Sequence, residues 1–439
     1  RRDKSYIGQR VTNPMSVAII TTFAVLSVIG VPLAVSMALG AAAGLFLSGS
    51  FPLHIFSQTI YTAMDNFLMV AVPLFVLAGK LMEHGGIARR IFDFADRWTV
   101  RLRGGLGHVN IIASFIFGGI SGSSVADAAS LGRIEVVEMT RRGYPIDYSA
   151  ALSMASSALA TVVPPSILMV VAGAAAGESI ARLLIAGIGP GLLFSGLMML
   201  VNYAFARAYG YGSVGTFDLH KALTSTLDAL PALLAPGIIV GGIVFGYYTP
   251  TEAAAIAVLY SAVVGILIYR ELPLKALPRI LVDSAKTSGT VLLIAATAKT
   301  ASWLFTMDGV PQGVTGLVMS VGASQTLVLL VLVMALVLIG MFMDAMAALL
   351  ILVPLLYPIG VAVGINGVHL VTLIVSSLAF GLITPPVGVC LYAMAAVSGR
   401  PIEVIAKAGL AFYAVLFIGL LLIAYVPAIS LFLPGLVLP

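Results

Sequence analysis

The stretch GGISGSSVADAAS, residues 118–130, interrupts an otherwise apolar chain with glycines, hydroxyl groups and an aspartate. Of the 439 residues, 60% are hydrophobic and only 9% are charged, against about 25% charged residues in an average soluble domain. Apolar runs recur from Met15 onwards, and about 20 such residues cross a hydrocarbon core of about 30 Å. Continuous runs such as VLVMALVLIGMF favour helices over the alternating strands of a barrel. The composition therefore predicts an all-α polytopic membrane protein.

Charge, cysteine and histidine usage argue against several other classes. The formal net charge is +5 and is carried by arginines and lysines in loops, which is typical of a membrane topology signal and not of a nucleic-acid surface. Cys390 is the sole cysteine, so an internal disulfide framework is excluded. The five histidines are dispersed without metal-ligand spacing. We expect neither an enzyme nor a nucleic-acid partner.

The apolar segments follow the same order twice along the chain. Pro164 and Pro165 recur as Pro385 and Pro386, at an offset of 221 residues. We expect an N-terminal segment at 1–14, a first repeat at 15–210 with a hairpin at 106–140 and a broken helix at 148–177, a linker at 211–226, and a second repeat at 227–439 with a hairpin at 324–360 and a broken helix at 368–398.

Charge placement predicts that the two repeats are inverted in the membrane. Arginines precede and follow the first hairpin, namely Arg97, Arg101 and Arg103 before it and Arg133, Arg141 and Arg142 after it. Both ends should therefore face the cytoplasm, as in a re-entrant hairpin. The second hairpin, centred on GMFMDAM at 340–346, lies in a stretch without lysine or arginine from 300 to 399 and should open to the other side. Counting membrane crossings outward from the hairpins places four basic residues outside the cytoplasm, against this charge rule. They are Arg1, Arg2, Lys4 and Arg10.

Two kinds of helix break occur, each twice. The hairpin tips are SGSS at 121–124 and FMDA at 342–345, and the proline breaks are TVVPPS at 161–166 and LITPPV at 382–387. Non-helical backbone within a bilayer is tolerated only where protein, water or a ligand satisfies it. Proline removes a backbone donor and so frees a carbonyl in the preceding turn, and such oxygens are hard ligands that suit alkali cations. We expect two cation sites, with serines at one tip and Asp344 at the other.

An anionic substrate is expected between the tips. Half-helices that begin there direct positive dipole ends to the centre, and Lys299 adds a candidate positive charge. Structural alternatives stay open: a double proline as a kink, SGSS as a helix-packing surface, Asp127 as a satisfied structural group, and Lys299 as a snorkelling residue or a partner of Asp308. Asp344 has no such simple explanation, because a lone buried carboxylate is costly.

Several motifs resemble one family over essentially the whole chain. They are GGISGSSVADAASLG, RRGYPIDYSAALSMASSALATVVPPS, GIGPGLL, TPTEAAA and FGLITPPVG. In this order they look like the large membrane subunit of tripartite ATP-independent periplasmic (TRAP) transporters.

The resemblance implies sodium-coupled uptake of a small organic acid by an elevator mechanism, on a fold like that of the ion transporter superfamily, in the bacterial inner membrane. It also implies a small four-helix membrane subunit, separate or fused N-terminally, and a periplasmic substrate-binding protein. The family's first sodium site maps onto Ser121, Ser123 and the carbonyls around Ala160, Val163 and Pro165. Its second maps onto Gly340, Asp344, Thr384 and Val387, and the substrate is expected near Ser123, Ser124 and Asp127.

The leading hypothesis is a sodium-driven importer of organic acids. The runner-up is a stand-alone sodium/dicarboxylate symporter that needs no binding protein. An intramembrane hydrolase lacks a histidine partner for its serines, and an ion channel lacks a charged pore ring. The sequence does not indicate which acid is carried, the sodium stoichiometry or the oligomeric state.

Overall fold

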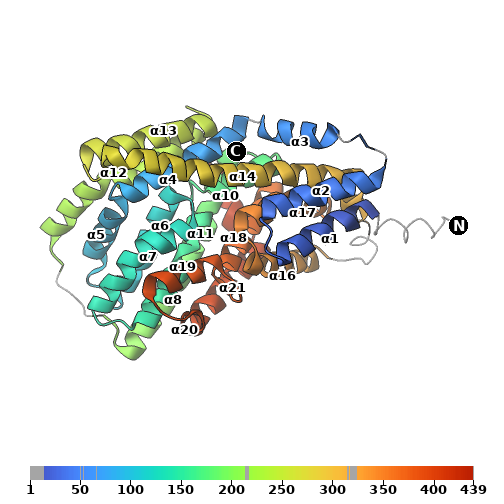
Figure 1. Ribbon diagram of the computed structural model, residues 1–439. Helices are drawn as coiled ribbons and strands as arrows, with labels where there is room; N and C mark the ends of the chain where they lie inside the picture. The colour runs from blue at the N-terminus through green and yellow to red at the C-terminus, as the bar shows by residue number, and fades with distance from the viewer. Residues whose placement is uncertain are drawn as a thin grey trace.

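The regular structure of the described residues is entirely helical (Figure 1). The computed structural model describes residues 14–438, except 50, 53, 66, 213–216, 314, 315 and 317–323. Six of the described helices are long and apolar enough to cross a membrane, and three bent helix pairs raise that number to nine. This confirms the all-α polytopic class. Residues 1–13, with the four basic residues that disagreed with the charge count, lie outside the described residues.

The first half of the chain contains a helix pair, a hairpin and a broken helix. Its helices are α1 (Pro14–Val28), α2 (Leu33–Ser48), α3 (His54–Met64), η2 (Phe67–Val70), α4 (Ala71–His84), α5 (Ile87–Thr99), α6 (Gly105–Ser121), α7 (Ser124–Arg141), α8 (Ile146–Ser157), α9 (Leu159–Val162), α10 (Ile167–Ala176) and α11 (Ile180–Tyr209).

The second half again contains a hairpin followed by a broken helix. Its helices are α12 (Leu219–Val244), α13 (Pro250–Val263), η3 (Val264–Ile268), η4 (Leu274–Ala276), α14 (Leu277–Met307), α16 (Gln325–Phe342), α17 (Ala345–Ala362), α18 (Gly367–Ile383), α19 (Val389–Ser398), α20 (Ile402–Ala408), α21 (Leu410–Tyr425) and α22 (Ala428–Val437).

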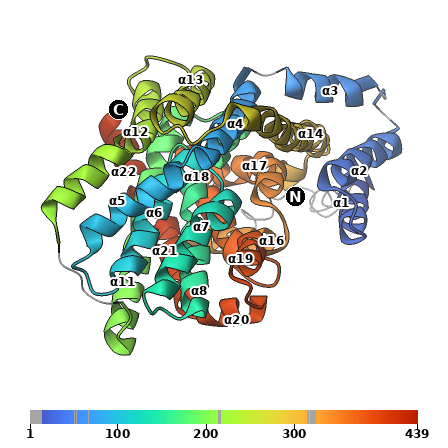
Figure 2. The ribbon, with the colours of Figure 1, turned by 60° about the vertical axis from the view of Figure 1, so that its left-hand side comes forward.

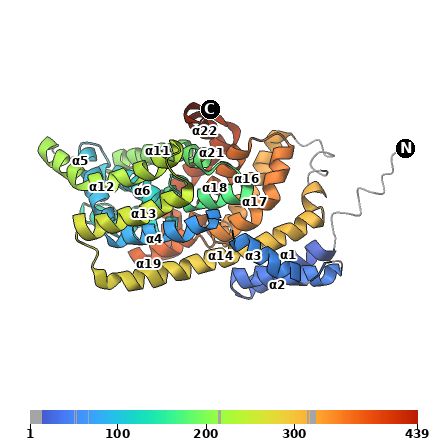
Figure 3. The ribbon, with the colours of Figure 1, turned by 90° about the horizontal axis from the view of Figure 1, so that it is seen from above.

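The two broken helices form the centre of the molecule. Every residue from Tyr148 to Gly173 is buried, and so is every residue from Val368 to Ile383. A helix that is apolar on all sides is buried in a protein core or in a membrane, and these two helices are buried by protein. Figure 3 shows α18 between α11, α21 and α22 on one side and α14 on the other. The hairpins pack against this centre, since α6 and α7 contact α8, and α16 and α17 contact α18.

Helices α4, α12, α13 and α14 form a layer over the core. In Figure 1 they run along the top of the molecule, with α5 at one end and the α1–α2 pair at the other. Helix α4 contacts α6, α13 and α14, and α14 contacts α17. In Figure 2 the segment α1–α3 extends away from the core. The hairpins therefore pack against this layer through α4 and α14.

Helices end at both hairpin tips and at both proline pairs, and polar residues set several other helix boundaries. Helix α12 begins at Leu219, inside the segment expected as a linker, because the Asp218 side chain accepts a hydrogen bond from the Lys221 N–H and caps the helix. Helix α14 begins at Leu277 and so includes a polar turn before its apolar part. The apolar stretch at 60–82 is divided between α3 and η2–α4, with residue 66 outside the described residues.

Candidate ion and substrate site

The first hairpin reverses direction within two residues. Helix α6 ends at Ser121, and Gly122 adopts a left-handed conformation with φ 62°, which glycine reaches without strain. The Gly122 N–H donates to the Gly118 carbonyl over 2.8 Å. Ser123 is the N-cap of α7, and its hydroxyl accepts a hydrogen bond from the Ala126 N–H. The tip therefore places three serine hydroxyls, including that of Ser124, around the positive end of a helix.

The second hairpin reverses without a glycine. Helix α16 ends at Phe342, Met343 is extended, and Asp344 caps α17. The Asp344 carboxylate accepts hydrogen bonds from the N–H groups of Met346 at 2.9 Å and Ala347 at 3.3 Å. One carboxylate oxygen, Oδ1, makes both bonds. The aspartate therefore also has a structural role as a helix cap.

Each broken helix opens at its proline pair. Helix α9 ends at Val162, Val163 is extended, and the peptide between Pro164 and Pro165 is cis. In the second half α18 ends at Ile383, followed by extended Thr384 and a second cis Pro-Pro peptide. Since Pro164 has no N–H, the Ala160 carbonyl loses its helical donor. Hard carbonyl and hydroxyl oxygens are therefore present at both breaks, and this donor set fits an alkali cation.

Each hairpin lies directly against the facing break. A Cβ atom added to Gly118 would lie 2.6 Å from the Ala160 Cα atom, and one added to Gly122 would lie 3.3 Å from the Pro165 carbonyl oxygen. In the second half a Cβ on Gly381 would lie 2.6 Å from the Gly340 carbonyl carbon. The Gly388 N–H donates to the Met341 carbonyl over 3.2 Å. The structure thus places each tip against its facing break, with Ala160, Pro165 and Gly340 of the expected cation-site residues at these contacts.

The two tips share one cavity of about 210 Å³. Ser121, Ser123 and Ser124 line it from the first hairpin, and Asp344 lines it from the second. Its remaining wall comes from α4, α10, α14 and the ends of α9 and α18, and includes Val76, Gly79, Lys80, Glu83, Thr161, Ile167, Leu168, Thr287, Val291 and Leu382. A solute in this cavity would contact both hairpins at once.

Two residues expected near the substrate lie elsewhere. Asp127 is 1% exposed and does not line the cavity. Its Oδ2 atom accepts a hydrogen bond from Ser114 at 2.9 Å, inside a network with Asn110 and Glu135. Lys299 lines a separate cavity of about 100 Å³ with α3, α10 and α17 residues. The structure therefore brings together the serines and Asp344 but not these two side chains.

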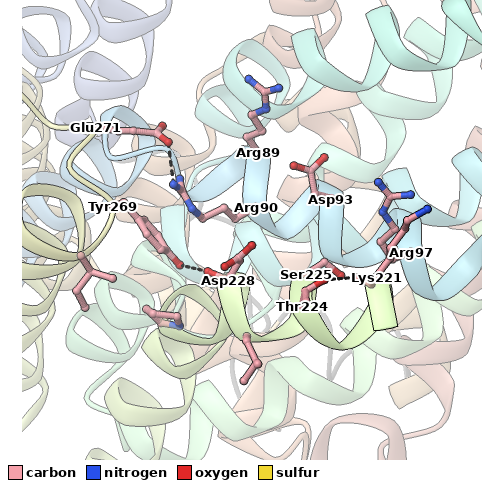
Figure 4. A pocket seen from close by; sticks show the side chains of 13 residues that line it. Arg89, Arg90, Asp93, Arg97, Lys221, Thr224, Ser225, Asp228, Tyr269 and Glu271 are labelled. Carbon is pink, nitrogen blue, oxygen red and sulfur yellow. Dashed lines mark hydrogen bonds and ion pairs between the residues drawn. The ribbon is translucent and has the colours of Figure 1, made fainter. Parts of the chain in front are cut away.

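A second cavity, of about 820 Å³, lies apart from the tips and shares no lining residue with the cavity between them (Figure 4). It lies between α5 and α12 and is lined by both basic and acidic side chains. Arg90 forms a 2.8 Å ion pair with Glu271, and its guanidinium lies 3.8 Å from the centre of the Tyr269 ring. Figure 4 shows Asp93 between Arg89 and Arg97. These contacts connect the amphipathic helix α5 to the outer layer.

Sequence reasoning missed Lys80, Glu83 and Thr287 as cavity residues. Lys80 and Glu83 are visible as polar positions in the run LFVLAGKLMEH. Only the packing of α4 against α6 and α10, however, shows that this face meets the hairpin tips.

Comparison with known proteins identifies relatives over most of the chain. A family model described as the DctM component of tripartite ATP-independent periplasmic transporters matches residues 20–429. The C4-dicarboxylate TRAP transporter large permease protein DctM of Pseudomonas aeruginosa is 37% identical, over 89% of this chain and 93% of that protein. The sialic acid TRAP large permease SiaM of Vibrio cholerae is 36% identical, over 93% and 96%.

The chain is also similar to a fused permease and, in fold, to a solved transporter structure. The isethionate TRAP transporter permease protein DctMQ of Oleidesulfovibrio alaskensis is 36% identical, and the match covers 94% of this chain and 65% of that protein. The Alcanivorax borkumensis YdaH transporter has a similar fold, with a TM-score of 0.63 at 13% identity, over 94% of this chain and 98% of that one. From these matches, the chain belongs to the DctM family, the large permease component of tripartite ATP-independent periplasmic transporters.

Proposed function

We propose that this permease imports small organic anions and that sodium ions bound at the two hairpin tips drive the import. The cavity shared by both tips is the observation that supports this most strongly. Its walls combine the positive ends of α7 and α17 with the Asp344 carboxylate, so cations and an anion can bind next to each other.

The first sodium ion is proposed to bind Ser121, Ser123 and the carbonyls at Ala160, Val163 and Pro165. The second is proposed to bind at Gly340, Asp344, Thr384 and Val387. Both sets lie where a tip meets a broken helix. Sodium at these places would screen the Asp344 charge and supply positive charge for the substrate. The tips would then be ordered only when ions and substrate are present together.

Transport is proposed to follow an elevator mechanism. The moving core consists of both hairpins and both broken helices, related as inverted repeats, and the fixed part includes α4 and α11–α14. Helices α4 and α14 form the cavity wall opposite the tips, so movement of the core past them would carry the cavity across the membrane. A membrane potential of 100 mV supplies about 2.3 kcal/mol for each net positive charge that moves with the core.

The proposed substrate class is small organic anions. The names of three relatives specify a C4-dicarboxylate, sialic acid and isethionate, each of which carries an acidic group. The tripartite family name and the fused relative support the proposal that a periplasmic binding protein and a small membrane subunit, expected to have four helices, act with this chain. The binding protein would deliver the anion to the open cavity.

Uptake into liposomes tests this proposal. The full chain is reconstituted with the small subunit and binding protein of the same genome, and labelled organic acids are offered. We expect accumulation only with an inward sodium gradient, and none when potassium replaces sodium. Equal uptake in potassium would reject sodium coupling. Undiminished uptake without the binding protein would instead identify a stand-alone symporter.

A further inference from the structure

We propose that Lys80 of α4, on the fixed wall of the cavity, binds the carboxylate of the substrate in the conformation that this structure shows, and that Glu83, one turn later, restricts the site in this conformation to monocarboxylates bearing hydroxyl or amino groups. This inference deepens the proposed function and rests on it. It concerns the α4 wall of the shared cavity, which the sequence motifs did not indicate.

One face of α4 forms this wall. Val76, Gly79, Lys80 and Glu83 all line the cavity, and their spacing of three and four residues places them on one side of a helix. This face lies close to the first tip: a Cβ atom added to Gly79 would lie 3.0 Å from the Ser121 carbonyl oxygen. Lys80 follows Gly79 directly. Its side chain therefore starts beside the serines at the start of α7.

The Lys80 ammonium takes part in none of the ion pairs among the described residues, and it interacts electrostatically with Glu83 on the same helix face. It is also the one cation among the described residues that line the cavity. A lysine next to an apolar helix surface is costly unless it pairs or reaches water. A substrate carboxylate in the cavity would supply that partner.

The net charge of the groups that line the cavity, with two sodium ions bound, favours an anion with one negative charge. The cavity contains Lys80 with one positive charge, and Glu83 and Asp344 with one negative charge each. Two sodium ions bring the total to +1, which a single carboxylate neutralises. A dicarboxylate would leave an uncompensated negative charge in a site of low dielectric constant, which is unfavourable.

The remaining polar groups suit hydrogen-bond donors on the substrate. The Glu83 carboxylate accepts hydrogen bonds only, and the hydroxyls of Ser124, Thr161 and Thr287 both donate and accept. A hydroxyl or amino group on the substrate can therefore pair with Glu83 while the carboxylate pairs with Lys80. An unsubstituted acid would offer Glu83 no hydrogen-bond donor.

Binding to the purified full chain tests the assignment. The probes are D-glycerate as the hydroxylated monocarboxylate, succinate as the dicarboxylate and glycerol as the neutral control. Each is titrated in sodium and in potassium, with thermal stabilisation as the readout. We expect glycerate to bind wild type in sodium only and more tightly than succinate. Lys80→Met should weaken glycerate binding by about 10- to 100-fold, the range for a hydrogen bond to a charged group, and Lys80→Arg should retain most of it.

Glu83→Gln should change the relative affinity for two substrates, which misfolding would not do. Removal of this negative charge raises the total to +2, so the ratio of succinate to glycerate affinity should rise by about tenfold or more. The matched control is Lys275→Met, at an exposed lysine of η4 outside the cavity, which should behave as wild type.

The possible failures are distinguishable. If wild type binds glycerate with sodium but Lys80→Met binds it equally well, Lys80 only snorkels to water and the inference is wrong. If succinate binds wild type more tightly than glycerate, the charge count is wrong. If wild type shows no difference between sodium and potassium, the proposed function itself fails, and this inference fails with it.

Discussion

Asp344 combines two roles that substitution can separate. Its carboxylate caps α17 and lines the cavity between the tips. Serine caps helices about as well as aspartate, whereas alanine at an N-cap costs about 1 kcal/mol. We therefore expect Asp344→Ser to keep the stability of wild type and lose sodium stimulation of uptake. Asp344→Ala should lose both, as measured by thermal unfolding and by uptake.

A different outcome would limit Asp344 to the helix cap. If Asp344→Ser is stimulated by sodium as strongly as wild type, the carboxylate does not bind the ion. The cap would then be its whole function.

Asp127 and Glu135 form a buried acid pair next to the first tip. Both are at most 1% exposed, and the Ser114 hydroxyl oxygen lies within hydrogen-bond distance of both carboxyl groups, 2.9 Å from Asp127 and 3.4 Å from Glu135. Their described hydrogen-bond partners are hydroxyl and amide groups, none of them a cation. Two buried carboxylates that share one hydroxyl partner repel each other.

Glu135→Gln should therefore raise the melting temperature of the purified protein, because the amide keeps the shape of the side chain and removes one acid. Glu135→Ala should lower it, because Asn110 would lose an acceptor that lies 2.8 Å away. A lower melting temperature for Glu135→Gln would mean that a charged Glu135 stabilises the fold.

Residue chemistry predicted part of this site from the sequence. The serines at 121–124 and Asp344 stood out because polar groups are rare in hydrocarbon, and the structure places them around one cavity. Asp127 and Lys299 were equally visible but lie apart from it. Which of several polar residues share a cavity depends on helix packing, which local composition does not encode.

Close contact between helices holds each hairpin against its break. Gly381 of α18 lies against Gly340 of α16, and a Cβ atom on Gly381 would lie 2.6 Å from two backbone atoms of Gly340. Gly381→Ala must therefore push α16 away from the second break. We expect lower thermal stability and weaker sodium dependence of uptake.

The matched control for this substitution is Gly196→Ala in α11, where a Cβ atom meets nothing within 4 Å. Alanine is favoured over glycine in a helix by about 1 kcal/mol, so this variant should be as stable as wild type or more so. Equal behaviour of the two variants would show that the α16–α18 contact is not needed for the ion site.

Helices break at the tips and at the proline pairs for local reasons that are visible in the sequence. Proline lacks an N–H, and Gly122 adopts a left-handed backbone conformation. The start of α12 and the division between α3 and α4 were not predicted, because polar residues continue or end helices according to caps and tertiary contacts. The pairing of α4 with the tips depends on contacts between segments distant in the chain.

The whole molecule is a multi-pass protein of the bacterial inner membrane, as its family and its apolar helices indicate. The charge pattern predicts opposite orientations for its two hairpins. Cys390 is buried and is the sole native cysteine, so introduced cysteines can be labelled against a low background. In intact cells we expect Ala362→Cys, at the end of α17, to react with a membrane-impermeant maleimide, and Arg103→Cys to react only in inverted vesicles.

Labelling of both positions from the same side would exclude the inverted arrangement of the hairpins. Both residues are exposed, so a lack of reaction from one side reports sidedness and not burial.

The central claim is that sodium binds where each hairpin tip meets a broken helix. Equilibrium binding of radioactive sodium to the purified full chain, with an organic acid present, measures this most directly. We predict two sodium ions per chain for wild type and one for Asp344→Ser, which keeps the helix cap. No saturable sodium binding to wild type, or two ions bound by Asp344→Ser, would contradict the account.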